Sequence, residues 1–309
     1  MTTQPTTWTT RALLEWIAAA FDRAGVDSPR RAAEFLLAHV LGCERLRLYM
    51  DPDRPASEVE RDRLRTLVRR ALHGEPLQYL LGTWSFFGVE LACDARALIP
   101  RPSTETLVEH ILQHARRPDA APIRRIADIG TGAGSIALAL AMNLPNAHVI
   151  ATDISADALE LARENVDRHG LAGRVELRRG DLLEPLAGQT FDVIASNPPY
   201  IPDDEWQRVP TIVKDHEPAT ALRGGADGLD VVRRVLTEGP ALLQPGGWLV
   251  VEVAARTARD AAQLAGVQTG MTDAAVLQDS DGLDRVVAVR REGAAPRAQA
   301  SDLESAEWI

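Results

Sequence analysis

Cysteine, lysine and long apolar runs are scarce in this 309-residue sequence. The two cysteines, Cys43 and Cys93, have no metal-ligand spacing, so neither a disulfide framework nor a structural zinc site is expected, and a reducing cytoplasm fits best. No run of about 18 apolar residues occurs, which argues against a membrane protein. The N-terminus also lacks the basic and apolar regions of a signal peptide. The seven histidines form no cluster, and a nucleophile-elbow sequence is missing, so neither a metal centre nor a hydrolase is predicted.

Charge of one sign is concentrated in one part of the chain. The formal net charge is −10, yet residues 1–90 contain twelve Arg against five Asp and seven Glu, so the whole excess lies in residues 91–309. An acidic region of this size argues against tight, non-specific binding of nucleic acid, which depends on neutralising phosphates with cations. The neutral part contains an arginine-rich stretch that is either a solvated helix face or a docking face for a partner. Its members are Arg61, Arg63, Arg65, Arg69 and Arg70.

Apolar residues recur at helical spacing through the first quarter of the sequence. The expected helices are residues 9–24, a second helix beginning at Ser28-Pro29, and residues 57–73. Residues 1–74 are therefore predicted to form a small helical bundle. In residues 75–103 the pattern changes to the alternation of Trp84, Phe86, Val89 and Leu91, which predicts a linking β-hairpin.

From residue 104 onward, short apolar runs alternate with amphipathic segments. The predicted strands are residues 126–129, 149–152, 175–178, 191–195, 248–253, 275–277 and 286–290. The predicted helices are residues 104–116, 135–143, 156–169, 228–243 and 257–265. This alternation predicts an α/β domain over residues 104–290, with a mostly parallel seven-stranded sheet covered by helices on both faces. The last strand should run antiparallel because no helix precedes it, and residues 291–309 are expected to be a mobile tail.

A glycine-rich segment, Asp128-Ile-Gly-Thr-Gly-Ala-Gly134, lies where the first predicted strand of this domain turns into a helix. Its glycines would let the backbone turn tightly and approach a ligand, although a purely structural turn is the alternative. The spacing differs from the G-x-G-x-x-G of dinucleotide sites, and the Gly-Lys-Ser/Thr end of a P-loop is missing. The candidate binding residues of the turn are Gly130, Thr131, Gly132, Ala133 and Gly134.

Two acidic residues follow the next two predicted strands. Asp153 can accept hydrogen bonds from both hydroxyls of a ribose, because a carboxylate is a bidentate acceptor. The alternative is a helix N-cap, but Ser155 can take that role itself. Asp181, which is followed by Leu182, is placed to accept from the exocyclic amine of an adenine, or is simply a solvated loop carboxylate.

The most specific feature is Asn197-Pro198-Pro199-Tyr200, directly after the fourth predicted strand of the sheet. The two prolines restrict the backbone and remove two N–H donors, so carbonyl groups of the turn can face a cleft. Asn197 adds a side-chain acceptor and Tyr200 an aromatic face. Together they predict a site for a planar group that carries an NH2, against the alternative of an ordinary Pro-Pro turn.

These motifs, in this order, resemble those of S-adenosylmethionine-dependent amino-methyltransferases, and more narrowly the peptide-chain release factor glutamine methyltransferases. The resemblance covers roughly residues 28–290. Further matching segments are residues 75–82, 98–105, 197–202, Glu217-Pro218 and 222–229. The departures are Ser103 in place of a usual acidic residue, His216 in place of Tyr, and Ala254 in place of Gly.

The resemblance implies a Rossmann-like methyltransferase domain that uses S-adenosylmethionine as methyl donor. The implied reaction is methylation of the side-chain nitrogen (N5) of the glutamine in a Gly-Gly-Gln segment of a release factor. Residues 1–74 would recognise this protein substrate, with no direct binding of DNA and no membrane. Residues 100–105 would border the cofactor; the alternative for Arg101 and Glu105 is an ion pair that closes the hinge between the two domains.

The implied site residues belong to the motifs above. The cofactor would be bound by residues 130–134, Asp153, Asp181, Leu182 and Asn197. The substrate would be bound by Asn197, Pro198, Pro199 and Tyr200, of which Asn197, Pro198 and Tyr200 are the catalytic candidates.

Two other functions remain open at this point. A DNA adenine-N6 methyltransferase would offer a similar planar NH2 to the Asn-Pro-Pro-Tyr turn, but it would have to flip the base out of the duplex. The acidic catalytic region, without a large basic recognition domain, counts against it. A non-enzymatic adaptor that keeps only the fold is the other alternative, and failure to bind S-adenosylmethionine would support it.

Overall fold

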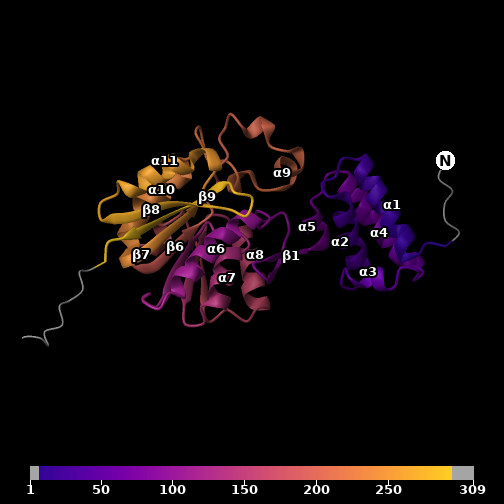
Figure 1. Ribbon diagram of the computed structural model, residues 1–309, viewed down its shortest axis with the longest axis horizontal. Helices are drawn as coiled ribbons and strands as arrows, with labels where there is room; N and C mark the ends of the chain where they lie inside the picture. Colours follow the sequence, from indigo (N-terminus) through magenta and orange to yellow (C-terminus); the bar gives the residue numbers. More distant parts are fainter. Residues whose placement is uncertain (1–6, 294–309) are drawn as a thin grey trace, which may run out of the picture.

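A computed structural model of the protein describes residues 7–293. Its N-terminal part is a bundle of helices, drawn in indigo and purple in Figure 1 and set apart from the rest of the chain. The helices are α1 (Thr10–Arg23), α2 (Pro29–Leu41), α3 (Arg47–Met50), α4 (Glu58–Leu72) and α5 (Leu77–Leu81). The three helices expected from the sequence are confirmed, whereas α3 and α5 were not predicted.

Local sequence explains where these helices begin. The hydroxyl of Thr9 accepts from the backbone N–H of Ala12, and Ser57 forms a capping box with Glu60 at the start of α4. The apolar faces then meet in one core, in which Ile17, Phe21 and Leu36 are fully buried. Leu80 of α5 belongs to the same core. The packed bundle therefore extends past Gly74, where the sequence pattern predicted its end.

A β-hairpin joins the bundle to the larger part of the molecule. Strands β1 (Thr83–Phe86) and β2 (Val89–Ala92) pair antiparallel, as the alternating pattern predicts. Phe87 and Gly88 form the turn, both with positive φ. Phe86, Val89 and Leu91 of the hairpin pack into the core of the larger domain, while Trp84 contacts Phe35 of the bundle, with ring centroids 5.4 Å apart.

The larger domain contains one seven-stranded sheet. Its strands are β3 (Arg125–Ile129), β4 (His148–Asp153), β5 (Val175–Arg179), β6 (Phe191–Ser196), β7 (Leu243–Glu252), β8 (Met271–Gln278) and β9 (Asp284–Arg291). Their order across the sheet is β5-β4-β3-β6-β7-β9-β8. Pairing is parallel from β5 to β7, and β9 lies antiparallel to both of its neighbours. The predicted mostly parallel sheet with an antiparallel last strand is thus confirmed.

Helices cover both faces of this sheet, which accounts for the apolar character of its strands. The α-helices of the domain are α6 (Pro102–Ala115), α7 (Ser135–Asn143), α8 (Ala156–Arg168), α9 (Thr211–His216), α10 (Asp230–Glu238) and α11 (Ala258–Gly266). Short 3₁₀ turns occur at Glu184–Leu186, Trp206–Arg208, Ala219–Ala221, Gly239–Leu242 and Ala255–Thr257. Helices α6, α7 and α8 bury their apolar sides on one face, and α10 and α11 on the other. Each fully buried Leu or Ile in these two clusters contributes about 1.5–3 kcal/mol.

Several predicted boundaries in this domain differ from the structure, among them that of β8, which begins at Met271 and not at Ala275. The helix expected over residues 228–243 ends as an α-helix at Glu238, and a 3₁₀ turn containing Pro240 follows it. Strand β7 begins at Leu243, before the expected Trp248, because Leu243 pairs with Phe191 across a register shift in β6. The predicted tail, residues 291–309, begins with the last residue of β9, and residues 294–309 lie outside the described part of the chain.

The topology determines where a ligand can bind. The strand order reverses between β3 and β6, and open sheets of this kind bind ligands at the carboxyl ends of the strands beside such a switch point. Within residues 7–293, none of the helices combines the length and the apolar character needed to cross a lipid bilayer.

Candidate functional site

The glycine-rich turn connects β3 to α7, as the sequence predicts. Gly130, Gly132 and Gly134 all have positive φ, which a residue with a Cβ rarely adopts. A Cβ on Gly134 would come within 2.6 Å of Leu138 Cδ1, so the end of that side chain would have to move, and the positive φ is the stronger reason for glycine here. Asp128 holds the turn from within: its Oδ2 accepts from Thr131 Oγ1 at 2.6 Å and from Ala137 N at 3.1 Å. Complete burial raises the pKa of Asp128 to about 7.

Asp153 faces the glycine turn from the end of β4. Its Oδ2 accepts from the backbone N–H of Gly132 and its Oδ1 from that of Ser155, both at 2.9 Å. Ser155 caps α8 through its own hydroxyl, which accepts from Ala158 N at 3.2 Å. The N-cap alternative for Asp153 is therefore wrong. Burial raises the pKa of Asp153, and each carboxylate oxygen retains a lone pair for a ligand.

A cavity of about 660 Å³ opens at this edge of the sheet. Six of the predicted cofactor residues line it, namely Gly130, Gly132, Asp153, Asp181, Leu182 and Asn197. Thr131 and Ala133 are buried, and neither they nor Gly134 line the cavity. Asp181 is also paired with Arg234, whose Nη1 donates to its Oδ2 at 2.9 Å. The other carboxylate oxygen of Asp181 makes no contact with Arg234.

The Asn-Pro-Pro-Tyr turn follows β6 at the same edge. It is tied to the neighbouring strand by Ser196, whose hydroxyl donates to the carbonyl of Ile129 at 2.8 Å. Asn197 and Tyr200 line a second, smaller cavity of about 210 Å³, while Pro198 is buried and Pro199 lines the larger one. Asn197 lines both cavities, so its side chain lies where the two meet.

The smaller cavity has mostly apolar walls. Leu98 and Arg101 form one side, and Val209 and Val213 contribute from the segment around α9. In Figure 1 this segment lies between the sheet domain and the bundle. A small cavity with mostly apolar walls that also contains an amide is suited to a side chain that ends in a polar group.

Thr104 and Glu252 form hydrogen bonds with the side chains of Asn197 and Tyr200. Asn197 Nδ2 donates to Thr104 Oγ1 at 3.0 Å, and Thr104 Oγ1 in turn donates to Glu252 Oε2 at 2.6 Å. The hydroxyl of Tyr200 donates to the other oxygen, Oε1, at 3.3 Å. Burial raises the pKa values of both Tyr200 and Glu252. Tyr200 therefore keeps its proton at neutral pH.

The residues between the hairpin and α6 make contacts that the sequence did not predict. Arg101 pairs with Glu217, whose Oε1 lies 2.5 Å from Arg101 Nη2, rather than with Glu105. Glu105 instead accepts from the backbone N–H of Phe87 at 2.8 Å, in the hairpin turn. The alternative of an Arg101–Glu105 ion pair is thus wrong, because Glu105 points along α6 toward the hairpin. Glu217 also accepts from Ile99 N at 3.0 Å, which fixes the segment that enters α6.

The contacts that Thr104, Glu217 and Glu252 make in the site were not predicted, although Thr104 and Glu217 lie in segments that resemble the family. A signal was available for Glu252, since a charged residue that ends a buried apolar strand is unusual. Thr104 and Glu217 give no comparable signal, because their partners are 148 and 116 residues away in the sequence.

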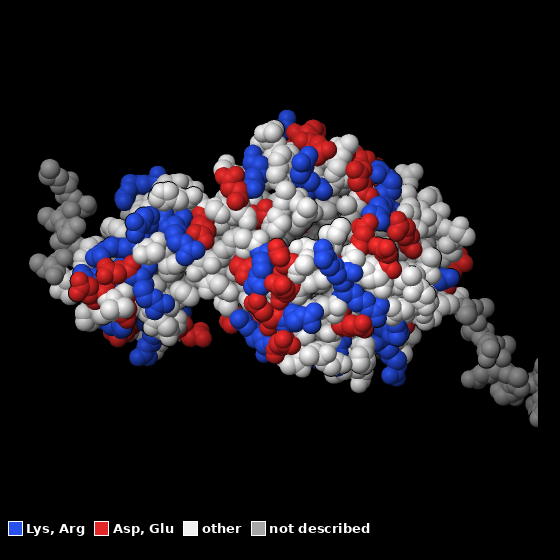
Figure 2. Space-filling view, turned by 180° about the vertical axis from the view of Figure 1, so that it is seen from behind, with Lys and Arg blue, Asp and Glu red and all other residues white. Residues whose placement is uncertain are grey.

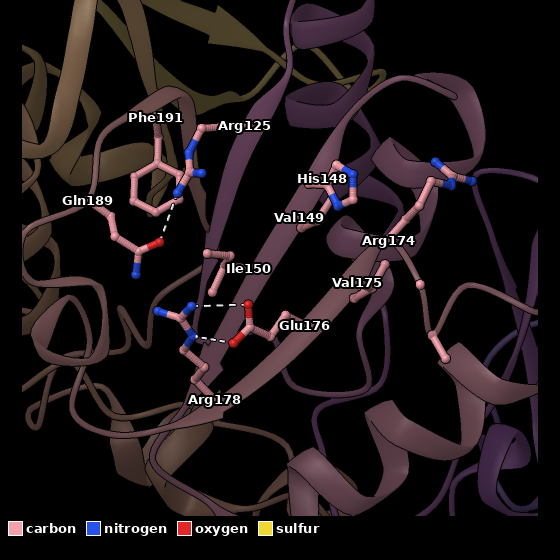
Figure 3. Close-up of a pocket in the computed structure, with 12 residues that line it drawn as sticks. Arg125, His148, Val149, Ile150, Arg174, Val175, Glu176, Arg178, Gln189 and Phe191 are labelled. Carbon is pink, nitrogen blue, oxygen red and sulfur yellow. Dashed lines mark hydrogen bonds and ion pairs between the residues drawn. The ribbon is translucent and has the colours of Figure 1, made fainter.

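Another hollow, of about 510 Å³, lies at the opposite end of the strands (Figure 3). Arg125 and His148 begin β3 and β4 there. Two arginines in Figure 3 are partnered by other side chains, Arg178 with Glu176 and Arg125 with Gln189, and the third, Arg174, donates to the carbonyl of Ala141. Figure 2 likewise shows acidic and basic side chains interspersed over the face in view. Neither feature provides the continuous basic surface that a nucleic-acid backbone requires.

Comparisons with known proteins agree with this architecture. The family model described as PrmC N-terminal domain matches residues 12–82, and the one described as methyltransferase small domain matches residues 102–215. A solved methyltransferase from Pyrococcus furiosus has the same fold, with a TM-score of 0.51 and 20% identity over 73% of this chain and 98% of that one.

Curated relatives extend over nearly the whole sequence. The release factor glutamine methyltransferase of Geobacter sulfurreducens is 42% identical over 94% of this chain and 99% of its own length. Those of Rhodopirellula baltica and Bacillus cereus are 40% and 35% identical, over 94% and 90% of this chain and 99% and 98% of their own lengths. These names do not favour a DNA adenine methyltransferase. With both motifs at one edge of the sheet and this similarity along the whole chain, the protein belongs to the release factor glutamine methyltransferase family.

Proposed function

We propose that the protein transfers a methyl group from S-adenosylmethionine to the side-chain nitrogen (N5) of the glutamine in a Gly-Gly-Gln segment of a peptide-chain release factor. The observation that carries this proposal is the place of Asn197, which lines both the larger and the smaller cavity. A methyl donor in one cavity and an amide in the other would meet at this side chain.

The larger cavity fits the cofactor in size and in chemistry. Its volume, about 660 Å³, lies within the range of roughly 300–1,000 Å³ that is usual for ligand sites. Asp153 would hold the ribose hydroxyls, Asp181 the adenine amine, and Gly130 and Gly132 would let the backbone approach the ligand. When bound, S-adenosylmethionine supplies an electrophilic methyl group.

Residues of the turn act on the acceptor amide. The nitrogen of a glutamine side chain is a poor nucleophile, because its lone pair is delocalised into the carbonyl. Asn197 Oδ1 and the Pro198 carbonyl would accept its two hydrogens, which orients the NH2 and raises its electron density. These hydrogen bonds strengthen as positive charge develops on nitrogen, so they favour the transition state over the ground state. Positioning then accounts for much of the rate.

Tyr200 provides a wall rather than a base. Its phenol keeps its proton, since burial and the neighbouring Glu252 carboxyl raise its pKa. Its ring lines the smaller cavity, where the flat face of the amide can stack on it. Proton abstraction before methyl transfer is thus not assigned to this residue.

The helical bundle, residues 1–74, serves in this proposal to dock the release factor. Arg69 of α4 and His73, the residue that follows this helix, line a shallow hollow of about 380 Å³ together with His216 of α9. The bundle therefore borders the segment that walls the smaller cavity. Within the arginine-rich stretch, Arg65 pairs with Asp62 and Arg70 with Glu75, so these two charges are partly neutralised. Replacing Arg69 by Glu should raise the KM for release factor and leave the Kd for S-adenosylmethionine unchanged.

The setting follows from the substrate. A protein that modifies a release factor works where translation takes place, and we assign it to the cytoplasm. Both cysteines are free, in keeping with a reducing compartment. Direct binding of DNA is not part of the proposal.

The test offers two acceptors in parallel. Labelled S-adenosylmethionine is incubated with the enzyme and either unmodified release factor or unmethylated duplex DNA. Mass spectrometry should locate the methyl on the glutamine of the Gly-Gly-Gln segment. A release factor with glutamate at that position is the matched control and should stay unmethylated, since it has no NH2 and brings a carboxylate against two acceptors. Methylated adenine with untouched release factor would overturn the proposal.

A further inference from the structure

The side-chain amide of Asn197 can direct either its oxygen or its nitrogen toward the acceptor group, and a rotation of 180° exchanges the two. Its oxygen accepts hydrogen bonds and its nitrogen donates them, although the two ends have nearly the same shape. An oxygen facing the cavities would bind the NH2 of a glutamine. A nitrogen facing the cavities would place the NH2 of Asn197 against the NH2 of the glutamine, and these two donors would repel each other. The chemistry of the site thus depends on what fixes this rotation.

The side chains behind Asn197 provide the answer. The carboxylate of Glu252 is fully buried and can only accept hydrogen bonds. Thr104, which is 2% exposed, has a single hydroxyl hydrogen and donates it to Glu252 Oε2 at 2.6 Å. Its oxygen can then only accept from Asn197, and the group of Asn197 that lies 3.0 Å away is Nδ2. The direction of hydrogen bonding therefore runs from Asn197 through Thr104 to Glu252.

We propose that Thr104 and Glu252 are positioning residues that hold the Asn197 amide with its carbonyl oxygen toward the acceptor group. The inference rests on the proposed function, since it concerns how that acceptor is bound. Glu252 sets the direction of the chain, and Thr104 transmits it to Asn197. Neither Thr104 nor Glu252 lines the larger or the smaller cavity, so both act through Asn197.

Other contacts keep Glu252 in its accepting role. Ser103 Oγ donates to Oε1 at 3.0 Å, and the hydroxyl of Tyr200 donates to the same oxygen at 3.3 Å. Both carboxylate oxygens are thus occupied by hydroxyl donors, and the charge of Arg285 adds attraction. The group is held by residues from β7, α6 and the Asn-Pro-Pro-Tyr turn, which joins three separate segments into one unit.

The first test replaces Thr104 by Val, which keeps the branched shape but removes the hydroxyl. In the productive rotation, the Asn197 NH2 would then be buried without an acceptor. This penalty should lower kcat for release factor methylation roughly 10- to 100-fold. The Kd for S-adenosylmethionine should stay within about threefold, since the larger cavity is untouched. Thr104→Ser retains a hydroxyl and should restore most of kcat.

A matched control comes from the same helix. Ser103→Ala removes a donor to the same carboxylate but has no contact with Asn197, so kcat should fall much less than with Thr104→Val. Assays are run over a range of pH, since burial raises the pKa of Glu252 and the proposed direction of hydrogen bonding requires its carboxylate form. Thermal unfolding of each variant separates loss of activity from loss of fold.

A double-mutant cycle isolates the orientation itself. With Asn197→Asp, an acceptor oxygen faces the cavities in either rotation, so Thr104→Val should then cost within about threefold in kcat. A purely structural role predicts the same loss in both backgrounds, and that result would overturn the inference. Full activity of Thr104→Val beside Asn197 would also overturn it. Failure of the wild-type enzyme to methylate release factor would instead refute the proposed function.

Discussion

Asp153 offers a direct test of how the larger cavity recognises its ligand. Its carboxylate is anchored by two backbone N–H groups at 2.9 Å, those of Gly132 and Ser155, and it lies on the cavity wall. The remaining lone pairs of the Asp153 carboxylate are thereby oriented for a ligand, and binding requires no further ordering of this side chain. Asp153→Ala removes this preorganised acceptor and also leaves the Gly132 N–H without its partner.

The magnitude follows from the hydrogen bond that is lost. A hydrogen bond to a charged group contributes about 1.5–3 kcal/mol, which corresponds to a roughly ten- to hundredfold change in Kd. Isothermal titration calorimetry with S-adenosylmethionine measures it directly. The control is Asp157→Ala, an exposed acidic residue in the first turn of α8 that does not line the cavity. It removes the same charge and should leave Kd within about twofold, because exposed charges at this range are screened.

The same carboxyl predicts a pH dependence of binding. Burial raises the pKa of Asp153, so the carboxylate begins to take up a proton at a higher pH than an ordinary aspartate. Kd should therefore rise as the pH falls through this pKa, and Asp153→Ala should lose that part of the dependence. An unchanged Kd for a folded Asp153→Ala variant would refute the assignment of Asp153 to the ribose.

Three further predictions concern the acceptor, the core and the thiols. Asn197→Ala removes one of two acceptors for the glutamine NH2, so the loss should appear in kcat, at ~10²–10³-fold. Asn197→Asp should retain more activity than Ala, and equal activity of the wild type and Asn197→Ala would contradict the mechanism. The pKa of Asp128 is about 7 in the folded protein and ordinarily near 4, so ionisation of this carboxyl destabilises the fold. The destabilisation is absent below about pH 4 and complete above about pH 7. Denaturant unfolding should therefore show the wild type losing about 1.4 kcal/mol per pH unit across this window relative to Asp128→Asn, and parallel pH profiles would rule this out. Burial raises the pKa of the Cys93 thiol to about 12. An alkylating reagent should therefore modify Cys43 first and reach Cys93 only on unfolding. Rapid labelling of Cys93 in the folded protein would contradict this prediction.

Local sequence determined most of the elements and the identity of the motifs. Gly134 with its positive φ, Ser155 as a helix cap, and Pro198-Pro199 after a buried strand each depend on near neighbours in the chain. Such requirements are visible in the sequence because backbone conformation and capping act over a few residues. The alternation of strands and helices similarly gave the parallel sheet, and with it the prediction that Asp153 and Asn197 lie at one edge.

Elements without a local pattern of their own were missed. Helix α5 has five residues, too few to show a helical period, and it forms because Leu80 is buried in the core of the bundle. Strand β7 starts at Leu243, although Pro245 and Gly246 suggest a loop, because pairing with Phe191 extends it. In both cases burial and pairing with distant segments outweigh local preference.

The partners of the functional side chains were decided by the tertiary structure alone. Thr104 meets Glu252 across 148 residues of sequence, and Arg101 meets Glu217 across 116. From the sequence alone, any nearby acidic residue, such as Glu105, was an equally good ion-pair partner for Arg101. A hydrogen bond depends on atoms being within about 3 Å, and the packing of α6 against the carboxyl ends of the strands sets those distances. The sequence therefore supplied Asn197, the proposed acceptor, while the folded chain supplied its proposed positioning residues, Thr104 and Glu252.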